Sequence, residues 1–534
     1  MTVASYALSK WRYGLVCLLL SGLAALLVAR LVMLQVTDEG GGAVFLREQG
    51  AIRTIRTAEI PVYRGLIEDR NGTPLAVSSP VVSLWANPQL LKDSPRLGEL
   101  AALLDVDPTE LHEKLAFYGD KQFMYLARHQ TPDFARQVLQ GQFPGVKGER
   151  EYRRYYPAGE VTAQVLGLTN VDGRGIAGVE MAFEEWLRGV PGKKRFIKDL
   201  HGDMVRDFGV IDEPRPGKTL TLSLDLRLQY VQHRELQRAM KETGAVAGSA
   251  VTLDAWTGEV LAISNYPVFN PNARSTLDYG SARNRAVTDV YEPGSTIKTL
   301  TLVAALESGQ FSLDSVIDTS PGRIRVGSKV LHDPRNYGEM TVSNIIEKSS
   351  QVGVTKLAQA VGHEAILDVL SRFGLGQETG TGFPGERAGV LPELAHWSDI
   401  EKVTLAFGYG LNATPIQLAR AYAVLANGGV RRPLTLIKQD PKSVTEGDRV
   451  VTADIARDVL TVLGRVTEPG GTATLAQVPG FSVGGKTGTA YKVEGKGYAD
   501  KKYRGFFVGM APIEKPRIVV AVMIDEPSNG FHFG

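Results

Sequence analysis

The chain has 534 residues, which is too long for a single hydrophobic core, so we expect about two to four domains. A net charge of +2 and an ordinary composition, 43% hydrophobic and 22% charged, give no reason to expect nucleic-acid binding. The one cysteine, Cys17, excludes an intramolecular disulfide and a cysteine-based metal site. The eight histidines are dispersed and form no ligand pair, so we expect no metal and no cofactor.

The first predicted element is an apolar membrane anchor at residues 13–36. About 20 apolar residues cross a bilayer core, and the run reaches this length if Arg30 lies near the outer interface. Lys10 and Arg12 precede the run, so the positive-inside rule places residues 1–12 in the cytoplasm. A cleaved signal peptide is the alternative, but its apolar region spans only about 7–15 residues. We therefore expect an uncleaved single-pass anchor.

Turn signals and short periodic runs alternate beyond the anchor. Residues 37–60 are polar and of mixed charge, which is typical of a linker. Asn71-Gly72 lies between two β-prone runs and predicts a hairpin. The spacing of leucines in residues 95–140 predicts helices, and the prolines and glycines of residues 190–218 predict a turn-rich boundary.

The rest of the chain, residues 218–534, has the pattern of one α+β domain. Two strand-like runs, 249–254 and 259–264, predict an antiparallel hairpin. Residues 341–420 are mainly helical in pattern, and strand-like runs return between 481 and 524. This order indicates a single sheet that takes strands from both ends of the domain.

Ser295 and Lys298 lie one helical turn apart in the sequence Ser-Thr-Ile-Lys. A serine is a weak nucleophile until a base removes its proton, and a lysine can be that base where burial and a second cation lower its pKa. A proline–glycine pair precedes Ser295, so we expect it to open a helix whose N-terminal partial charge favours an alkoxide. In isolation the pattern also fits an ordinary helix start beside a solvated lysine.

A second motif, Lys486-Thr487-Gly488-Thr489, lies on a predicted strand about 190 residues further along. Its ammonium and hydroxyl groups suit an anionic carboxylate, and Gly488 lets the strand approach a ligand closely. An ordinary edge strand is the alternative. Together the two motifs indicate an enzyme with a serine nucleophile.

These motifs, with Ser349-Ser350-Gln351 between them, resemble those of class B penicillin-binding proteins, the acyl-serine peptidoglycan transpeptidases. The sequence of residues 64–78 is most similar to that of the division-type, septal members. The resemblance implies an α+β transpeptidase domain at 218–534, with an antiparallel sheet flanked by helices plus an all-helical subdomain. An elongated non-catalytic pedestal of the dimerisation type, with its linker, would occupy 37–217 and follow one transmembrane helix.

The resemblance also implies roles for single residues. Ser295 attacks the D-Ala-D-Ala carbonyl, Lys298 accepts its proton, and Ser349 relays protons to the leaving group. The backbone N–H groups of Ser295 and Thr489 hold the oxyanion. Substrate-binding residues would be Gln351, Lys486, Thr487, Gly488, Thr489, Tyr503 and Phe533, of which Tyr503 and Phe533 form an aromatic wall or, alternatively, only pack in the sheet.

The implied substrates are peptidoglycan stem peptides and their lipid-linked precursors, and the implied covalent inhibitors are β-lactam antibiotics. The implied partners are a polytopic glycosyltransferase of the shape, elongation, division and sporulation (SEDS) family and other divisome proteins. The catalytic domain would lie in the periplasm, held by the bacterial inner membrane. The motifs leave open a D,D-carboxypeptidase, which passes the acyl group to water, and a non-catalytic scaffold or β-lactam sensor.

Two departures from the family pattern stand out. The second motif is normally Ser-x-Asn, and Gln351 adds a methylene that moves the amide by roughly 1.5 Å. Because an error near 1 Å can cost about a hundredfold in rate, we predict altered kinetics. The sequence also stops after Phe533-Gly534, so we expect the domain to lack the helix that usually covers its sheet.

Overall fold

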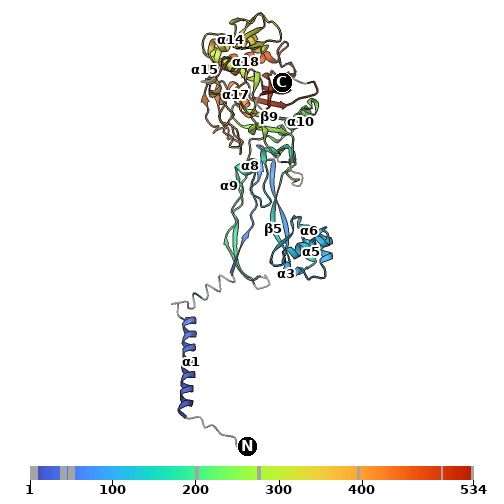
Figure 1. Ribbon diagram of the computed structural model, residues 1–534, viewed down its shortest axis with the longest axis vertical. Helices are drawn as coiled ribbons and strands as arrows, with labels where there is room; N and C mark the ends of the chain where they lie inside the picture. Colours follow the sequence, from blue (N-terminus) through green and yellow to red (C-terminus); the bar gives the residue numbers. More distant parts are fainter. Residues whose placement is uncertain are drawn as a thin grey trace. The chain divides into compact units, whose positions relative to one another are not determined.

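The computed structural model describes residues 10–36, 45, 55–198, 204–273, 278, 280–393, 397–494 and 497–530 (Figure 1). These fall into two units, the first within residues 1–62 and 190–216 and the second within residues 63–189 and 217–534.

The first unit contains helix α1 (Lys10–Val36), whose 27 residues include the predicted anchor. Of the described helices, α1 alone is long and apolar enough to cross a membrane. Its leucines are exposed, as with Leu18 at 75%, because no part of the unit covers them. By length and composition, α1 is a candidate to span a membrane.

The first unit also contains a three-stranded antiparallel sheet in the order β1 (Ile55–Ile60), β6 (Gly192–Lys198) and β7 (Met204–Asp212). The prediction of a linker is therefore wrong for β1, and the prediction of a turn-rich boundary is wrong for β6 and β7. β1 pairs with a strand more than 130 residues away, Ile60 opposite Gly192. Pairing over such a distance leaves no signal in local composition.

In the second unit, a long strand organises the residues after Tyr63. This strand, β3 (Pro74–Ala86), pairs with β2 (Ile67–Glu68), β4 (Met124–Gln130) and β5 (Val146–Tyr155). The hairpin predicted at Asn71-Gly72 is confirmed, because it joins β2 to β3 with Ile67 opposite Ala76. β8 (Leu220–Thr221) pairs with β2 in parallel.

Four helices pack around the far part of β3. They are α3 (Pro88–Leu91), α4 (Leu97–Leu104), α5 (Pro108–Phe117) and α6 (Pro132–Gln140). The helical prediction for 95–140 is confirmed for three of them but wrong at β4. Asp107 caps α5, since its carboxylate accepts from two backbone N–H groups of the first turn.

A buried ion cluster ties the short helices α8 (Gly178–Ala182) and α9 (Glu184–Leu187) to the strands. The Glu180 carboxylate is fully buried and accepts from Arg64 Nε at 2.5 Å and Arg154 Nε at 2.6 Å. Arg64 also donates to Glu184 at 2.6 Å. Each buried charge in this cluster therefore has a partner of opposite sign. Two further short helices, η1 (Gly159–Val161) and α7 (Ala163–Leu166), precede α8 in the chain.

The central sheet is antiparallel and five-stranded. Its order is β10 (Val260–Tyr266), β9 (Ala247–Asp254), β19 (Ile518–Asp525), β18 (Gly497–Ala511) and β17 (Gly484–Glu494). The predicted hairpin of β9 and β10 and the sheet built from both ends of the domain are confirmed. The expected strand at 481–483 is wrong, because β17 begins at Gly484.

Helices α10 (Leu226–Thr243), α17 (Pro415–Ala426) and α18 (Ala453–Thr467) pack against this sheet (Figure 1). The helical region holds α11 (Arg285–Thr288), η3 (Gly294–Ile297), α12 (Lys298–Glu307), α13 (Val342–Glu347), α14 (Gln351–Val361), α15 (His363–Arg372), α16 (Asp399–Thr404) and η5 (Leu405–Phe407). The helical prediction for 341–420 is thus confirmed. α12 is buried on nearly all sides, as its apolar sequence predicts.

Short strand pairs connect these helices. β11 (Val316–Asp318) pairs with β14 (Glu339–Thr341), β12 (Arg323–Val326) with β13 (Lys329–His332), and β15 (Val430–Arg431) with β16 (Asp448–Arg449). η6 (Thr474–Ala476) precedes β17. The β12–β13 hairpin matters for the site, because the residue that follows β13 reaches the second motif.

Candidate active site

The serine of the first motif lies in the first turn of its helix. Ser295 belongs to η3, and its carbonyl accepts the backbone N–H of Lys298, the first residue of α12. Ser295 is partly exposed, whereas Lys298 is buried. A helix start beside a partly open serine supplies both access for a substrate and partial positive charge.

Strand β17 lies directly against this serine turn. A Cβ at Gly488 would come within 2.9 Å of the Pro293 carbonyl oxygen and of the Thr296 methyl group. A Cβ at Gly294, where φ is +57°, would come within 2.7 Å of the Thr489 carbonyl oxygen. Gly488 therefore lets the strand approach the turn that carries Ser295. The sequence predicted a close approach to a ligand instead.

The ammonium group of Lys298 lies in the interior of the site. Its Nζ donates to the Ser349 carbonyl oxygen at 2.7 Å and to Ser349 Oγ at 3.2 Å. Burial lowers the pKa of Lys298 to about 8, although the charge of Asp333 acts in the opposite direction. Lys298 is therefore desolvated, and with this pKa a fraction of it is neutral near physiological pH.

Lys486 approaches the same hydroxyl from the sheet. It is fully buried, and its Nζ donates to Ser349 Oγ at 3.1 Å and to the Thr487 carbonyl oxygen at 3.1 Å. Burial and the neighbouring charge of Lys298 lower its pKa well below the usual range. The first and third motifs, far apart in the sequence, therefore meet at Ser349, and their lysines donate to one hydroxyl oxygen.

Ser349 has an unusual backbone conformation. Its φ is +56°, in the left-handed region that costs a residue with a side chain about 1–2 kcal/mol. Hydrogen bonds from Ser349 N to Ile346 O at 3.1 Å and from Ser350 N to Ile345 O at 2.8 Å hold the turn in place. This conformation presents both the carbonyl and the hydroxyl of Ser349 to Lys298.

A carboxylate that no motif indicates fixes the second motif. Asp333 is buried and accepts from Ser350 Oγ at 2.6 Å, from Gln351 N at 2.5 Å and from Val352 N at 3.2 Å. It thereby satisfies free N–H groups at the start of α14. Sequence reasoning missed Asp333, and a lone aspartate before a proline offers no signal that could have revealed it.

Gln351 begins helix α14, and its side chain is partly exposed. Its backbone N–H is bound to Asp333, but its side-chain amide has no hydrogen-bond partner among the residues that the structure describes. The amide is therefore open to a ligand, and its role in binding stays a prediction.

The outer face of β17 carries the hydroxyl groups of the third motif. Thr487 and Thr489 are partly exposed and alternate with the buried Lys486 and Gly488. Thr487 Oγ1 lies 3.3 Å from Thr472 Oγ1. Hydroxyls on one face and an ammonium below are a suitable surface for a carboxylate.

The two aromatic candidates have different outcomes. Tyr503 of β18 lies opposite Tyr491 of β17, with ring centroids 5.2 Å apart, so it does pack across the sheet. Its partial exposure leaves the aromatic-wall role a prediction. Phe533 lies outside the described residues.

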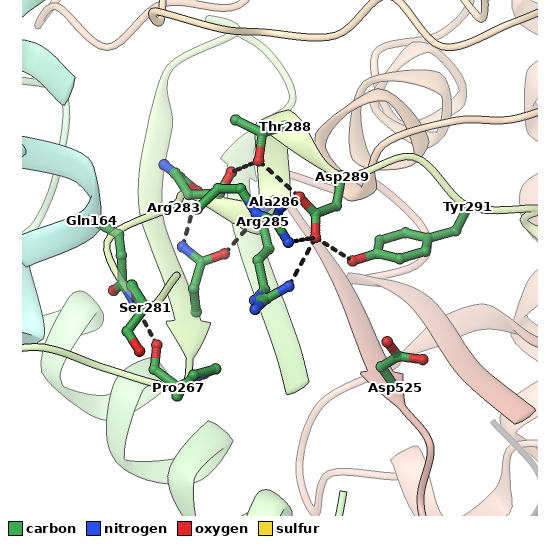
Figure 2. Close-up of polar contacts among 12 residues, drawn as sticks. Gln164, Pro267, Ser281, Arg283, Arg285, Ala286, Thr288, Asp289, Tyr291 and Asp525 are labelled. Carbon is green, nitrogen blue, oxygen red and sulfur yellow. Dashed lines mark hydrogen bonds and ion pairs between the residues drawn. The ribbon is translucent and has the colours of Figure 1, made fainter. Parts of the chain in front are cut away.

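The segment that leads to the serine is held by a polar hub on Asp289 (Figure 2). The carboxylate accepts from Arg283 at 2.9 Å, from Arg285 at 3.0 Å and from the Tyr291 hydroxyl at 3.0 Å. Burial and the nearby carboxylates raise the pKa of Tyr291, so it remains a phenol that can donate. The hub fixes the chain four residues before Ser295.

Helix α17 secures the serine helix from the other side. The Tyr422 hydroxyl donates to the Thr296 carbonyl at 2.7 Å and lies 2.9 Å from Thr299 Oγ1. Burial raises the pKa of Tyr422, which keeps its proton in place. Nothing in the apolar sequence of α17 marks this tyrosine in advance.

Together these features define the site of a serine acyltransferase. A serine opens a buried helix, a lysine with a lowered pKa follows one turn later, and a strand with a second lysine closes the site. Nucleophile, base and a donor-rich strand edge are the parts that acyl transfer requires.

Comparisons with known proteins agree with this class. Residues 248–533 match the family model of the penicillin-binding protein transpeptidase domain, and residues 59–222 match that of the penicillin-binding protein dimerisation domain. The peptidoglycan D,D-transpeptidase FtsI of Escherichia coli K12 is 40% identical over 531 residues, covering 98% of this chain and 89% of that protein. The probable peptidoglycan D,D-transpeptidase PbpC of Pseudomonas aeruginosa is 40% identical over 514 residues, covering 96% and 90%.

A solved structure gives the same result. Penicillin-binding protein 3 of Mycobacterium tuberculosis, complexed with aztreonam, aligns with a TM-score of 0.66 and 31% identity, covering 88% of this chain and 91% of that one. The chain therefore belongs to the penicillin-binding protein transpeptidase family, and the resemblance inferred from its motifs is confirmed.

Proposed function

We propose that the protein is a peptidoglycan D,D-transpeptidase that cross-links stem peptides at the division septum through an acyl-serine intermediate on Ser295. The observation that carries this proposal is the cluster at Ser349, where the ammonium groups of Lys298 and Lys486 share one hydroxyl at 3.2 and 3.1 Å. The names and chain-length coverage of the relatives support the same activity.

Acylation begins with Ser295 and Lys298. Neutral Lys298 takes the serine proton as Ser295 Oγ attacks the carbonyl of the penultimate D-alanine. The backbone N–H groups of Ser295 and Thr489 stabilise the oxyanion. The contact between Lys298 and Ser349 Oγ then offers a path for this proton to the amine of the departing D-alanine.

Substrate binding would use the outer face of β17 and the start of α14. Thr487 and Thr489 donate to the terminal carboxylate, while buried Lys486 adds positive charge from below. The amide of Gln351 binds the peptide backbone. Tyr503 and Phe533 are proposed as an aromatic wall beside this path.

The same site would bind β-lactam antibiotics covalently at Ser295. A cyclic amide that occupies the place of the peptide meets the same nucleophile and the same base. A structural relative complexed with aztreonam supports this part of the proposal.

We further propose the division of the chain and its topology. Residues 1–12 would lie in the cytoplasm, 13–36 would span the inner membrane once, 37–217 would form linker and pedestal, and 218–534 would catalyse in the periplasm. The length and apolar surface of α1 support the span. A SEDS-family glycosyltransferase and other divisome proteins would contact the anchor and pedestal.

Product analysis tests the function. Purified protein is supplied with a D-Ala-D-Ala donor peptide, with and without an acceptor amine. The assay then quantifies three products: D-alanine, hydrolysed donor and cross-linked peptide. A transpeptidase yields cross-linked product that rises with the acceptor, whereas hydrolysed donor alone indicates a D,D-carboxypeptidase. Release of no D-alanine and no labelling by a fluorescent penicillin would indicate a scaffold.

A further inference from the structure

A buried carboxylate beside the nucleophile has no assigned role. Glu292 precedes Ser295 by three residues, and only 9% of it is exposed. Its Oε1 accepts from the Gly410 N–H at 2.9 Å and from the Tyr498 hydroxyl at 3.4 Å. Its Oε2 is buried and has no hydrogen-bond partner in the part of the chain that the structure describes.

An unpartnered carboxylate oxygen in the interior is costly, because burial removes the water that would otherwise solvate it. Burial raises the pKa of Glu292 for the same reason. Two other buried carboxylates, Glu180 and Asp333, accept hydrogen bonds on both of their oxygens. Glu292 therefore lacks a donor that a bound molecule could supply.

Three tyrosine rings form a cluster that meets this carboxylate at the Tyr498 hydroxyl. Tyr409 and Tyr498 lie with ring centroids 5.9 Å apart and nearly perpendicular, and Tyr491 follows 6.0 Å from Tyr498. Burial and the charge of Glu292 raise the pKa of Tyr409 to about 12, so its ring stays a neutral phenol. A carboxylate beside aromatic rings offers an ammonium group both a counter-charge and ring faces that attract cations.

The nearest cation is already engaged. The charge of Arg504 acts on Glu292, but its Nε donates to Asp525 at 3.1 Å and its guanidinium lies 4.6 Å from the centre of the Tyr291 ring. The described residues contain no ion pair to Glu292 within 4.0 Å. The catalytic cluster at Lys298 and Lys486 offers an incoming ammonium no negative charge, because both lysines donate to the neutral hydroxyl of Ser349.

Glu292 lies close to the nucleophile along the chain. Two residues lie between Glu292 and Ser295, so their Cα atoms are at most about 11 Å apart. On β17, Tyr491 follows Thr489 by two residues and so shares its face. The ring cluster therefore continues the surface on which the substrate is proposed to lie.

We propose that Glu292, together with the rings of Tyr409 and Tyr498, binds the ammonium group of the stem peptide that accepts the acyl chain. This inference rests on the proposed transpeptidase function. The ammonium gives one proton to the Glu292 carboxylate, and the resulting amine attacks the ester carbonyl. A C–N bond forms, the C–O bond to Ser295 breaks, and the second amine proton passes to Ser295 Oγ, which leaves a neutral amide and a free serine.

A purely positional role for Glu292 makes a different prediction. Its bond from Gly410 N–H would hold the loop after η5 in place, and glutamine can accept that bond equally well. Glu292→Gln therefore removes the charge and keeps the acceptor. Glu526→Gln is the matched control, because Glu526 is a carboxylate at the end of the same sheet that already pairs with Lys492.

The experiment measures how the acyl-enzyme divides between acceptor and water. A thioester donor acylates wild type and both variants, and the ratio of aminolysis to hydrolysis is followed against D-alaninamide, a cationic acceptor, and hydroxylamine, which is neutral at pH 7. Because the ratio is taken after acylation, it does not depend on how fast Ser295 reacts. For Glu292→Gln we expect the ratio with D-alaninamide to fall about tenfold, the usual scale for a charge-assisted hydrogen bond.

With hydroxylamine the ratio should keep its wild-type value, and Glu526→Gln should match wild type with both acceptors. An unchanged ratio with D-alaninamide, or an equal loss with both acceptors, would overturn the proposal. A second measurement compares the KM of a donor that contains lysine with that of its norleucine analogue, which lacks the ammonium. If Glu292→Gln raises only the KM of the lysine donor, the ammonium that Glu292 binds belongs to the donor, and the proposal is also overturned. Failure of the wild type to form any acyl-enzyme would instead contradict the proposed function.

Discussion

Two buried clusters of charge in this chain differ in how their charges are balanced. At Glu180, one carboxylate faces the guanidinium groups of Arg64 and Arg154 at 2.5 and 2.6 Å. At Ser349, two ammonium groups face one neutral hydroxyl at 3.2 and 3.1 Å. The cluster at Glu180 stabilises the charged forms of its side chains, whereas the cluster at Ser349 destabilises the charged forms of its two lysines.

This difference separates a structural role from a chemical one. Opposite charges around Glu180 keep each group ionised and hold α8 and α9 to the strands. Burial lowers the pKa of Lys298 to about 8, although the charge of Asp333 acts in the opposite direction, and this value suits the base that we propose it to be. The following changes test this contrast.

The largest effect is expected for Lys298→Met. This change removes the proposed base, and general-base catalysis contributes about a hundredfold to ten-thousandfold. We expect acylation by a fluorescent penicillin to fall by about a thousandfold, while Tm does not fall, because the substitution removes the cost of burying the amine. Acylation within tenfold of wild type would show that another group takes the serine proton.

Glu180→Gln should produce the opposite pattern. It leaves Arg64 and Arg154 buried without their shared counter-charge, and breaking such a cluster costs about 3–5 kcal/mol. Thermal or denaturant unfolding measures this loss, and acylation per folded molecule should persist. Glu99→Gln is the control, because its ion pair with Arg96 is exposed and such pairs contribute about 0–1 kcal/mol. Equal losses for the two variants would refute the contrast.

The acylation rate should rise with pH. Lys298 acts as a base only when neutral, so below its pKa of about 8 the rate should fall about tenfold for each pH unit. Between pH 8 and the ordinary lysine value the unfolded chain binds more protons than the folded one, so stability should also rise with pH there. Because the charge of Asp333 raises the pKa of Lys298, Asp333→Asn should move the midpoint to lower pH. A rate that is flat from pH 6 to 9 would exclude this base.

The smallest effect is expected for Gln351→Asn. The substitution draws the side-chain amide back by roughly 1.5 Å and restores the usual Ser-x-Asn motif, so we expect acylation rates to rise by up to about tenfold. Gln359→Asn on the same helix is the control, since its side chain is exposed and belongs to no motif. An unchanged acylation rate for Gln351→Asn would show that this glutamine does not alter the kinetics.

The catalytic domain was accessible to sequence reasoning because its signals are local. Ser295 and Lys298 share one helical turn, and Lys486 to Thr489 form one strand segment, so each motif carries its own geometry. The hairpin of β9 and β10 is equally local. Family resemblance then related the motifs to one another.

What the sequence did not reveal depends on contacts between distant segments. β6 pairs with β1, more than 130 residues away, and its run of basic residues masks the strand alternation. Asp333 acquires its role only when the β13 hairpin meets the start of α14. Burial of Glu292 likewise depends on Gly410 and Tyr498, from two other parts of the chain.

The most direct test of the central claim is mass spectrometry of the intact protein after exposure to a β-lactam, followed by mapping of the modified peptide. We expect one adduct per chain on Ser295 and its loss in Ser295→Ala, with much slower formation in Lys298→Met. No adduct, or an adduct that persists in Ser295→Ala, would contradict the account.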